Sequence, residues 1–413
     1  MSDDVVRKEK QQFKDFTLLD WILLLLLICS NFTCPLAFSC ISPFYNTVAF
    51  TKGLSLSECG IVFAIFNFLG IFASPVIGPL IPKIGLRILL PSGMIITAIG
   101  TLLFAITINI QSESWFFIVS LVLRLVQSMI ETFVGLGYTL GPFIGGLLYD
   151  AGGYILPFIV LGVILLICGI LSIFFIKVDK DESFIRLNYT IYYKLVKIPD
   201  VWIIMGSAIF AGIAFQYHDV TLPEVLKEFN LSSSQIGSFF LLMGVPYAIL
   251  TPIYGFILDK YGGGSYFIIT GSIFSIVAFY CFGPAPFIPF KRNLVTLIIM
   301  SIFEGISVGG LYIPCFTKSL KTLVKDYHFP ENLETSSLLS GIFGMCYSFG
   351  AVLGPSGGSF LVDQLNYEWS TFIYGTAMLI YLFIFIFLYY IPRNLRKNKV
   401  KNIEENLSTI VNE

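Results

Sequence analysis

The sequence predicts an all-α membrane protein made of two parallel six-helix repeats, the first of them shortened, with about 11 spans. The chain is 56% hydrophobic and 12% charged with a mean hydropathy of +0.84, so one water-soluble core could not bury its apolar surface. Its apolar residues form long runs, and runs of about 18 or more indicate membrane-spanning helices. Finally, the stretch LGPFIGGLLYD at residues 140–150 returns as LGPSGGSFLVD at residues 353–363, which indicates an internal duplication.

Ten apolar runs have the length of a full span, and a further run at 115–149 needs separate treatment. The first run follows a polar, acid-containing start, and no small-residue cleavage site comes after it. We therefore expect a retained helix and not a signal peptide. The ten runs cover residues 19–41, 58–80, 86–108, 154–177, 200–223, 234–258, 265–285, 293–316, 337–362 and 369–391.

The lysines and arginines predict the orientation, because they collect in cytoplasmic loops. With the loops numbered as in a twelve-helix protein, 20 of these residues fall on the side of both termini and 4 on the other side. Both termini and the polar stretch at 177–200, the only long break between apolar blocks, are therefore predicted to be cytoplasmic. The predicted divisions are a tail at 1–18, a shortened helix bundle at 19–177, a linker at 178–199, a six-helix bundle at 200–391 and a tail at 392–413.

A second motif recurs in the same order, since GPLIPKIG at 78–85 matches GFILDKYG at 255–262. Parallel six-helix repeats build one large class of secondary transporters, with the substrate path between the halves. Gly and Pro let helices approach closely and bend. One Gly-Pro pair could be a kink without function, but two copies in register predict a gating hinge in each half. The predicted hinge residues are Gly141, Pro142, Gly145, Gly354, Pro355 and Gly358, and the loop-motif residues are Gly78, Lys83, Gly85, Gly255, Asp259, Lys260 and Gly262.

On these motifs and the Arg124-x-x-Gln127 pair, the chain resembles the major facilitator superfamily. Within it, LGPFIGGLLYDAGGYILPFIVLG and the stretch at 218–262 are similar to the vesicular amine transporter family, closest to its polyamine branch. The resemblance implies exchange of lumenal protons for cytoplasmic cationic amines. Pro82 departs from the pattern because the superfamily usually has an acid there, whereas the second motif keeps Asp259. This departure argues against a charge latch on the cytoplasmic side of the first half.

The two repeats differ in length between their motifs. The first has 63 positions from Gly78 to Gly141, and the second has 99 from Gly255 to Gly354, a difference of 36. As a helix, residues 115–127 would reach about 20 Å, less than a hydrocarbon core of about 30 Å. A single span over 115–149 would place the two loop motifs on opposite faces, against the lysine and arginine count. We therefore hypothesise a shortened form of a twelve-helix protein, from alternative splicing or an incomplete gene model, with the gap after Gln127.

Ionisable groups inside spans are costly and indicate function. Glu304, in the middle of the tenth span, is a candidate for proton coupling or cation binding, and the alternative is a partner for a polar neighbour in its own bundle. Glu131, at the start of the truncated fifth helix, resembles an acid of the polyamine branch, although beside the gap it could simply sit near the interface. Tyr312 and Tyr347 could face an ammonium ion, but packing is their expected role.

Asp219 stands where the resembled family carries an acid, so it could receive a proton or steer an amine. His218 beside it would respond to vesicular pH. A solvated helix end is the alternative for both residues. Arg124 and Gln127 match the superfamily's fourth-helix motif, in which the resemblance implies that the arginine organises proton coupling.

The leading interpretation is a proton-coupled antiporter of small organic cations, polyamines or monoamines, that works by alternating access in an intracellular vesicle membrane. The alternatives are a drug or sugar carrier of the same superfamily and a truncated, non-transporting isoform that serves as a membrane scaffold. An enzyme is not expected, because the sequence has no nucleophile elbow, P-loop or metal-ligand cluster. We expect no cofactor beyond the proton gradient. The expected partners are the lipid bilayer, a cationic amine and protons, without nucleic acid, in a monomer.

Overall fold

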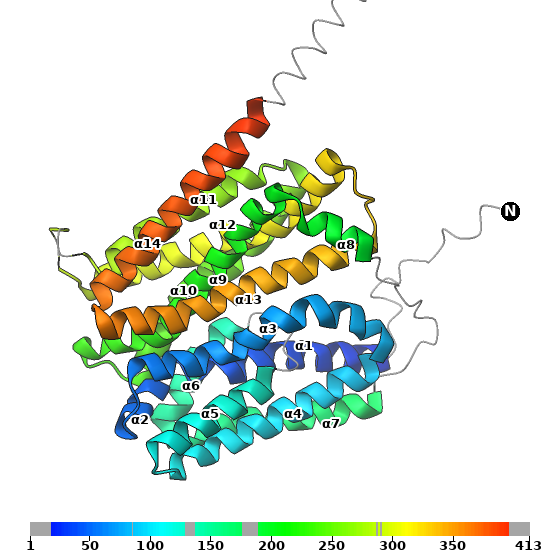
Figure 1. Cartoon of the computed structure of the whole chain (residues 1–413). Coiled ribbons are helices and arrows are strands. Elements are labelled where there is room, and N and C mark those ends of the chain that lie inside the picture. Colours follow the sequence, from blue (N-terminus) through cyan, green and yellow to red (C-terminus); the bar gives the residue numbers. More distant parts are fainter. Residues whose placement is uncertain are drawn as a thin grey trace, which may run out of the picture.

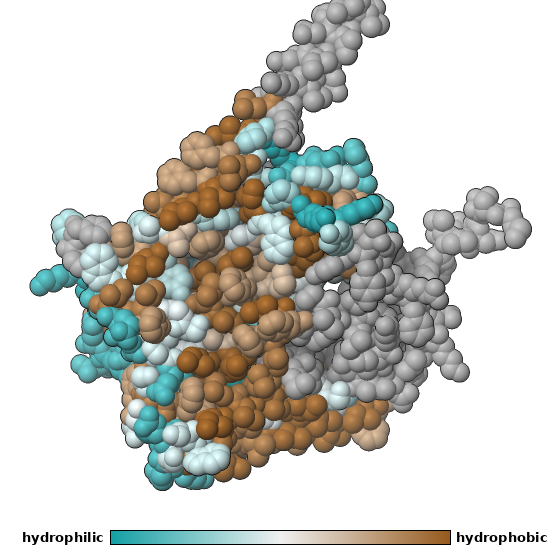
Figure 2. Space-filling model, viewed as in Figure 1, coloured by the Kyte–Doolittle hydropathy of each residue, from teal (hydrophilic) through white to brown (hydrophobic). Residues whose placement is uncertain are grey.

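A computed structural model describes residues 18–84, 86–128, 137–175, 189–285, 288–289 and 291–395. All regular secondary structure in these ranges is helical, which confirms the predicted all-α class. Eight of the described helices are long and apolar enough to cross a membrane. Apolar side chains cover much of the outer surface in Figure 2. Such a surface suits a lipid environment, because water-soluble monomers rarely expose apolar patches of this extent.

The first half occupies the lower part of Figure 1 and contains the helices up to residue 175. Two short elements, α2 and the 3₁₀ turn η2, interrupt the long apolar helices. The sequence did not predict α2. The elements are α1 (Leu18–Ser39), α2 (Tyr45–Thr51), α3 (Leu56–Ile84), α4 (Leu86–Ile106), η2 (Thr107–Asn109), α5 (Glu113–Ser128), α6 (Gly137–Gly152) and α7 (Ile155–Phe175).

The second half occupies the upper part of Figure 1. Part of the predicted linker lies outside the described residues, and the rest contains the short helix α8. The last long helix continues as a π-helical stretch, η4. The elements are α8 (Tyr189–Val196), α9 (Pro199–Leu226), η3 (Lys227–Phe229), α10 (Ser233–Lys260), α11 (Gly264–Phe282), α12 (Leu294–Tyr327), α13 (Leu333–Gln364), α14 (Tyr367–Ile384) and η4 (Phe385–Tyr390).

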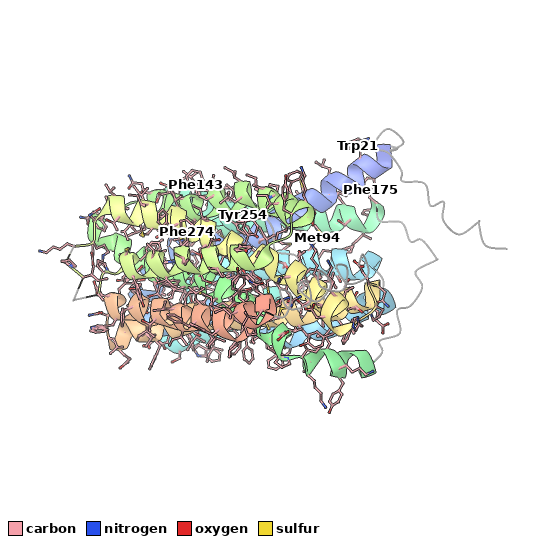
Figure 3. The ribbon with its side chains drawn as sticks, turned by 90° about the horizontal axis from the view of Figure 1, so that it is seen from above. Trp21, Met94, Phe143, Phe175, Tyr254 and Phe274 are labelled. Carbon is pink, nitrogen blue, oxygen red and sulfur yellow. The ribbon has the colours of Figure 1, made fainter. Side chains whose placement is uncertain are left out.

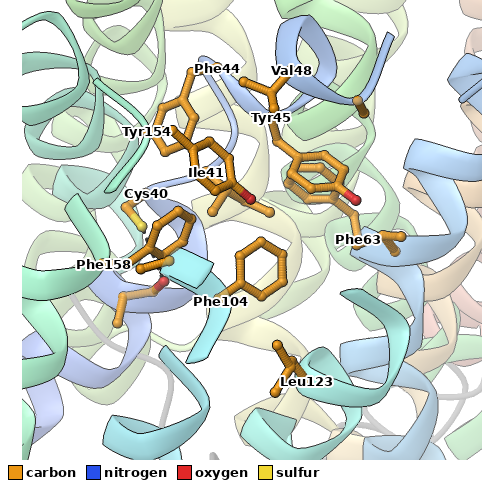
Figure 4. Close-up of a cluster of buried hydrophobic side chains, with 14 of the residues drawn as sticks. Cys40, Ile41, Phe44, Tyr45, Val48, Phe63, Phe104, Leu123, Tyr154 and Phe158 are labelled. Carbon is orange, nitrogen blue, oxygen red and sulfur yellow. Dashed lines mark hydrogen bonds between the residues drawn. The ribbon is translucent and has the colours of Figure 1, made fainter. Parts of the chain in front are cut away.

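Each half has a hydrophobic core of its own. In the first half, the rings of Phe104 and Phe158 lie 5.1 Å apart within a cluster of buried side chains from α1 to α7 (Figure 4). In the second half, two clusters join α9 to α12, α13 and α14. The halves meet along α3 with α13, α6 with α10, and the α1–α2 region with α9. The molecule is therefore two packed bundles with helix contacts between them, as the repeat predicts.

One end of the molecule, which we call the far end, gathers α2, η2 and η3. The Lys52 ammonium donates to the Ile108 carbonyl at 2.9 Å, and the Lys227 ammonium lies 4.3 Å from the Phe50 ring centroid. Helix α1 begins at the opposite end (Figure 1). The lysine and arginine count predicts that the far end faces away from the cytoplasm.

Over their described residues, helices α5 and α6 are shorter than a full crossing. Each has 16 residues and thus a length of about 24 Å, below the hydrocarbon thickness of about 30 Å. The Tyr45 ring stacks 6.0 Å from Phe116 at the start of α5, and the Phe44 ring stacks 4.5 Å from Tyr149 near the end of α6. Thus α5 leaves the far end and α6 returns to it. The single span over 115–149 is excluded, while the missing segment itself stays a prediction.

The first half consequently enters and leaves at one end. Trp21, near the start of α1, and Phe175, the last residue of α7, lie together at the end opposite the far end (Figure 3). This arrangement keeps both loop motifs on one side, as the charge count requires, even though two of the helices are short.

Candidate functional site

Equivalent residues of the two halves contact each other where the halves meet. Gly78 and its counterpart Gly255 are 177 positions apart, and so are Ser42 and Asp219. The Ser42 hydroxyl donates to Asp219 Oδ1 at 3.2 Å. Two residues that are each other's counterparts and touch must lie close to the pseudo-twofold axis. Asp219 therefore sits on the axis between the halves.

A second pair with the same separation supports this axis. Phe38 on α1 and Phe215 on α9 are also 177 positions apart, and Phe215 packs against the buried pair of Phe38 and Phe66. The Phe38 and Phe66 ring centroids lie 3.8 Å apart. The end of α1 and the turn after it thus meet α9 at the axis through an aromatic contact and a hydrogen bond.

Polar side chains extend this contact into a seam between the halves. The Asn67 amide donates to Gln216 Oε1 at 2.9 Å, and the Asn46 amide donates to the Val220 carbonyl at 2.7 Å. Gln216, Asp219 and Val220 share one face of α9, because residues three and four positions apart are neighbours on a helix. The sequence analysis missed Asn46 and Asn67, although polar residues within apolar stretches were the available signal.

The solvated alternative for Asp219 and His218 is wrong. Both side chains are 0% exposed. The His218 ring lies 4.4 Å from the Phe282 centroid and 5.7 Å from Phe279. Within the described part of the chain neither of its ring nitrogens has a hydrogen-bond partner. His218 therefore belongs to the core of the second half, and a response to vesicular pH stays a prediction.

Three tyrosines of the second half gather beside the axis. Tyr247 on α10, Tyr312 on α12 and Tyr347 on α13 interact with one another and are half-buried, so part of each side chain stays accessible. The Tyr312 and Tyr347 rings meet edge to face at 5.2 Å. Tyr347 also interacts electrostatically with Asp219. Aromatic faces near a carboxylate form the surroundings that a cationic ammonium group favours.

Glu304 lines a small pocket between α9, α10 and α12. Its side chain is buried, and Oε1 accepts a long hydrogen bond of 3.5 Å from the Ser275 hydroxyl. No described residue bonds to Oε2. The predicted alternative of a polar neighbour in the same bundle thus accounts for one oxygen only. The lining residues are Ala214, Phe215, Phe240, Met243, Gly244, Glu304, Gly305 and Val308.

The arginine motif lies on α5 and reaches the axis from the first half. The buried Arg124 guanidinium donates to Gln127 Oε1 and to the Phe38 carbonyl, both at 3.0 Å, and lies 4.6 Å from the Phe38 ring centroid. Gln127 in turn donates to the Thr101 hydroxyl at 3.0 Å. The separation of 177 positions pairs Gln127 with Glu304. Equivalent positions on α5 and α12 thus carry an amide in one half and an acid in the other.

Several predicted residues, or their side chains, lie outside the described part of the structure. Glu131 and Gly85 lie outside the described residues, and the side chain of Lys83 on α3 is likewise not described. In the second loop motif the Lys260 ammonium lies 5.1 Å from the Tyr261 ring centroid and 5.7 Å from that of Phe256.

The glycine-proline motifs lie within continuous helices α6 and α13 and are packing sites. A Cβ at Gly145 would lie 2.1 Å from the Cys40 carbonyl oxygen, and one at Gly358 would lie 2.6 Å from the Tyr217 ring. These contacts explain the glycines on steric grounds, because a larger residue at either position would collide with Cys40, which directly follows α1, or with Tyr217 on α9. The predicted hinge motion of Gly141, Pro142, Gly354 and Pro355 stays a prediction.

Comparison with known proteins identifies the family of this chain. The sequence profile of the Major Facilitator Superfamily matches residues 27–129 and 204–411. The rat MFS-type transporter SLC18B1 is 28% identical and the match covers 90% of this chain and 88% of that protein. The human synaptic vesicular amine transporter is 24% identical over 80% of this chain and 66% of that protein.

Solved structures with this arrangement of helices are also transporters. The nucleoside transporter NupG superposes with a TM-score of 0.66 at 14% identity, covering 88% of this chain and 98% of that one. A bacterial homologue of the human lysosomal transporter Spinster, in an inward-facing, occupied conformation, gives a TM-score of 0.66 at 13% identity over 91% and 96% of the two chains. At these identities the likeness concerns the fold alone.

Proposed function

Because this chain belongs to the major facilitator superfamily and is a multi-pass membrane transporter, we propose that it exchanges protons for small organic cations by alternating access between its halves. The observation that carries the proposal is Asp219, a buried carboxylate on the axis that is hydrogen-bonded across the halves through Ser42. A rocking motion of the halves must break and remake this contact. The charge state and occupancy of Asp219 are thereby coupled to the conformation.

The surroundings of Asp219 favour an amine as the substrate. An ammonium ion pairs with a carboxylate and lies well against aromatic faces. The half-buried Tyr247, Tyr312 and Tyr347 supply those faces. Similarity to the two vesicular amine transporters of vertebrates supports the same substrate class.

Glu304 is the second acidic group and carries the coupled proton in this proposal. It is buried beside a cavity, and Oε2 has no bonding partner among the described side chains. A buried carboxyl without a counter-ion is most readily kept as the neutral acid, and it would release its proton when the cavity opens to water.

Transport by the purified chain in proteoliposomes with an acidic interior tests the proposal. We expect uptake of spermidine or a monoamine, and no uptake of a sugar. Asp219→Asn should lower uptake roughly thirtyfold or more, because it removes the charge that pairs with the ammonium group. Glu304→Gln should abolish gradient-driven uptake and retain exchange of labelled for unlabelled amine without a gradient. Glu331→Gln, which changes an exposed acid before α13, is the matched control.

Two outcomes would contradict the proposal. Sugar uptake without amine uptake would indicate another kind of carrier of the same superfamily. Normal proton coupling in Glu304→Gln would remove that residue from the mechanism while leaving Asp219 to be judged by its own variant.

A second candidate function is a membrane scaffold that does not transport. The short α5 and α6 favour it, because their described lengths of about 24 Å fall below the hydrocarbon thickness of about 30 Å. If it holds, the purified chain transports none of the three substrates, and it co-purifies with a co-expressed twelve-helix relative and lowers that relative's uptake.

An intracellular vesicle membrane is the proposed location. Similarity to vesicular transporters supports it. Fractionation of cells that express a tagged chain tests the location, and recovery with the plasma membrane would contradict it.

A further inference from the structure

Helices α3 and α10 begin with equivalent sequences at the far end. Residues 54–60 read LSLSECG and residues 231–237 read LSSSQIG. Each start carries its own local cap. The Ser55 amide donates to Glu58 Oε2 at 2.7 Å, and the Ser232 amide donates to Gln235 Oε1 at 2.9 Å. These capping boxes satisfy part of each helix N-terminus from within its own half.

Each of these helix starts also receives a carboxylate from the other half. The Ser57 amide and hydroxyl donate to Asp363 Oδ2 at 2.8 and 2.5 Å. The Ser234 amide donates to Asp150 Oδ2 at 2.8 Å. Asp150 and Asp363 are the last residues of the two copies of the repeated glycine-proline stretch. The contact is thus present twice, once in each direction across the axis.

Close backbone packing accompanies each carboxylate. Three residues after each serine stands a glycine, and a Cβ at Gly60 would lie 2.5 Å from the Pro355 carbonyl oxygen. A Cβ at Gly237 would lie 2.4 Å from the Pro142 carbonyl oxygen. The same proline of the repeated stretch therefore meets the same glycine of the opposite half in both copies.

We propose that Asp150 and Asp363 form a pair of latches that hold the two halves together at the far end. A carboxylate at a helix N-terminus is stabilised by the orphan amide groups and the helix dipole, and hydrogen bonds to a charged group are stronger than neutral ones. Because the two bonds run in opposite directions across the axis, separating the halves breaks both at once. The far end opens only when both carboxylates release.

The latches are built to be reversible. Asp150 and Asp363 are both exposed, so water can replace the serine amides when the halves part. Bonds of this kind shift an equilibrium modestly, in contrast to a buried pair whose separation leaves a charge without a partner.

Hydrogen–deuterium exchange of the full chain in lipid nanodiscs tests the proposal without any substrate. Asp150→Asn keeps the size of the side chain and removes its charge. We expect exchange to quicken about tenfold at the start of α10, which Asp150 contacts, and also at the start of α3, which it does not contact. Asp363→Asn should give the mirrored result. A purely local cap would change only the helix start that the altered residue contacts, and that result would overturn the latch.

Ser55→Ala is the matched control for Asp363→Asn, because it removes the local cap of α3 and leaves the bonds from Ser57 to Asp363 in place. Its effect should stay within the start of α3. Labelling of Ser42→Cys gives a second readout, since residue 42 is 0% exposed between the halves. A membrane-impermeant maleimide applied at the far end should modify it faster in both aspartate variants than in the parent, and an unchanged rate would count against the latch. Neither readout requires amine transport, so the latch and the proposed function can fail separately.

Discussion

Helices α6 and α13 carry the same glycine-proline stretch, but α6 has 16 residues and α13 has 32. Both end at the far end with an aspartate that bonds the opposite half. Away from the far end, α12 and α13 extend well past their short counterparts α5 and α6. At the far end the two halves make equivalent contacts. These contacts involve only the end of α6, so they form even though α6 is much shorter than α13.

The paired residues also locate the difference in length. Ser57 and Ser234 are 177 positions apart, whereas Asp150 and Asp363 are 213 apart. Both pairs occupy equivalent places in the structure, so the second half has 36 additional positions between them. The Gly78–Gly255 pair keeps the smaller separation, which places the difference after the first loop motif.

The largest expected effect concerns the buried arginine. Arg124→Ala leaves Gln127 Oε1 and the Phe38 carbonyl without their donor, and we expect the free energy of unfolding to fall by about 3 kcal/mol. Its counterpart 177 positions later is Ser301, whose one hydroxyl bond within the described part of the chain goes to the Leu297 carbonyl of its own helix. Ser301→Ala should therefore cost about 0.5 kcal/mol or less. Denaturation in detergent micelles measures both, and equal losses would contradict this difference between the halves.

Restoring the short helices is the next test of the comparison. Insertion after Gln127 of the corresponding segment of the rat relative should raise amine uptake about tenfold or more, because α5 and α6 could then cross the whole bilayer. A glycine-serine insertion of equal length is the control and should not raise uptake. If the unmodified chain already transports as fast as the chimera, the short helices do not limit function.

The sequence predicted the helices better than it predicted their contacts. Apolar runs identified the long helices because a membrane span must satisfy its own backbone hydrogen bonds, yet they missed α2, a helix of only seven residues with polar ends. Asp219 and Glu304 were recognisable as acids within apolar stretches. Their surroundings were not, since the Ser42–Asp219 bond joins residues 177 positions apart, and only the packed repeats bring them together.

The contacts of Asp150 and Asp363 were likewise not predictable from the sequence. The repeated stretch was plain in the sequence, and its glycines and prolines drew attention as hinges. Its terminal Asp150 and Asp363 lay at the ends of apolar runs, where a solvated acid is ordinary. Their function depends on which helix start faces them, and no local pattern specifies a partner in the other half.

The smallest expected effect compares two glycines of one loop motif. Gly262 has a φ of +73° directly after the C-cap of α10, and its amide donates to the Leu258 carbonyl at 3.1 Å. This is the left-handed helix ending that favours glycine, so Gly262→Ala should lower the free energy of unfolding by about 1 kcal/mol. Gly255 lies inside α10, and a Cβ there would meet nothing within 4 Å. Gly255→Ala should therefore raise the free energy of unfolding by about 0.5 kcal/mol.

Thermal unfolding of both variants and the parent chain in one detergent tests whether Gly262→Ala lowers stability and Gly255→Ala raises it. The repeat extends the test to the first half, where Gly85 is the counterpart of Gly262. If α3 and α10 end in the same kind of turn, Gly85→Ala should lower the free energy of unfolding as much as Gly262→Ala does. A neutral Gly85→Ala beside a destabilising Gly262→Ala would mean that the halves differ at this end in their turns as well as in the lengths of their helices.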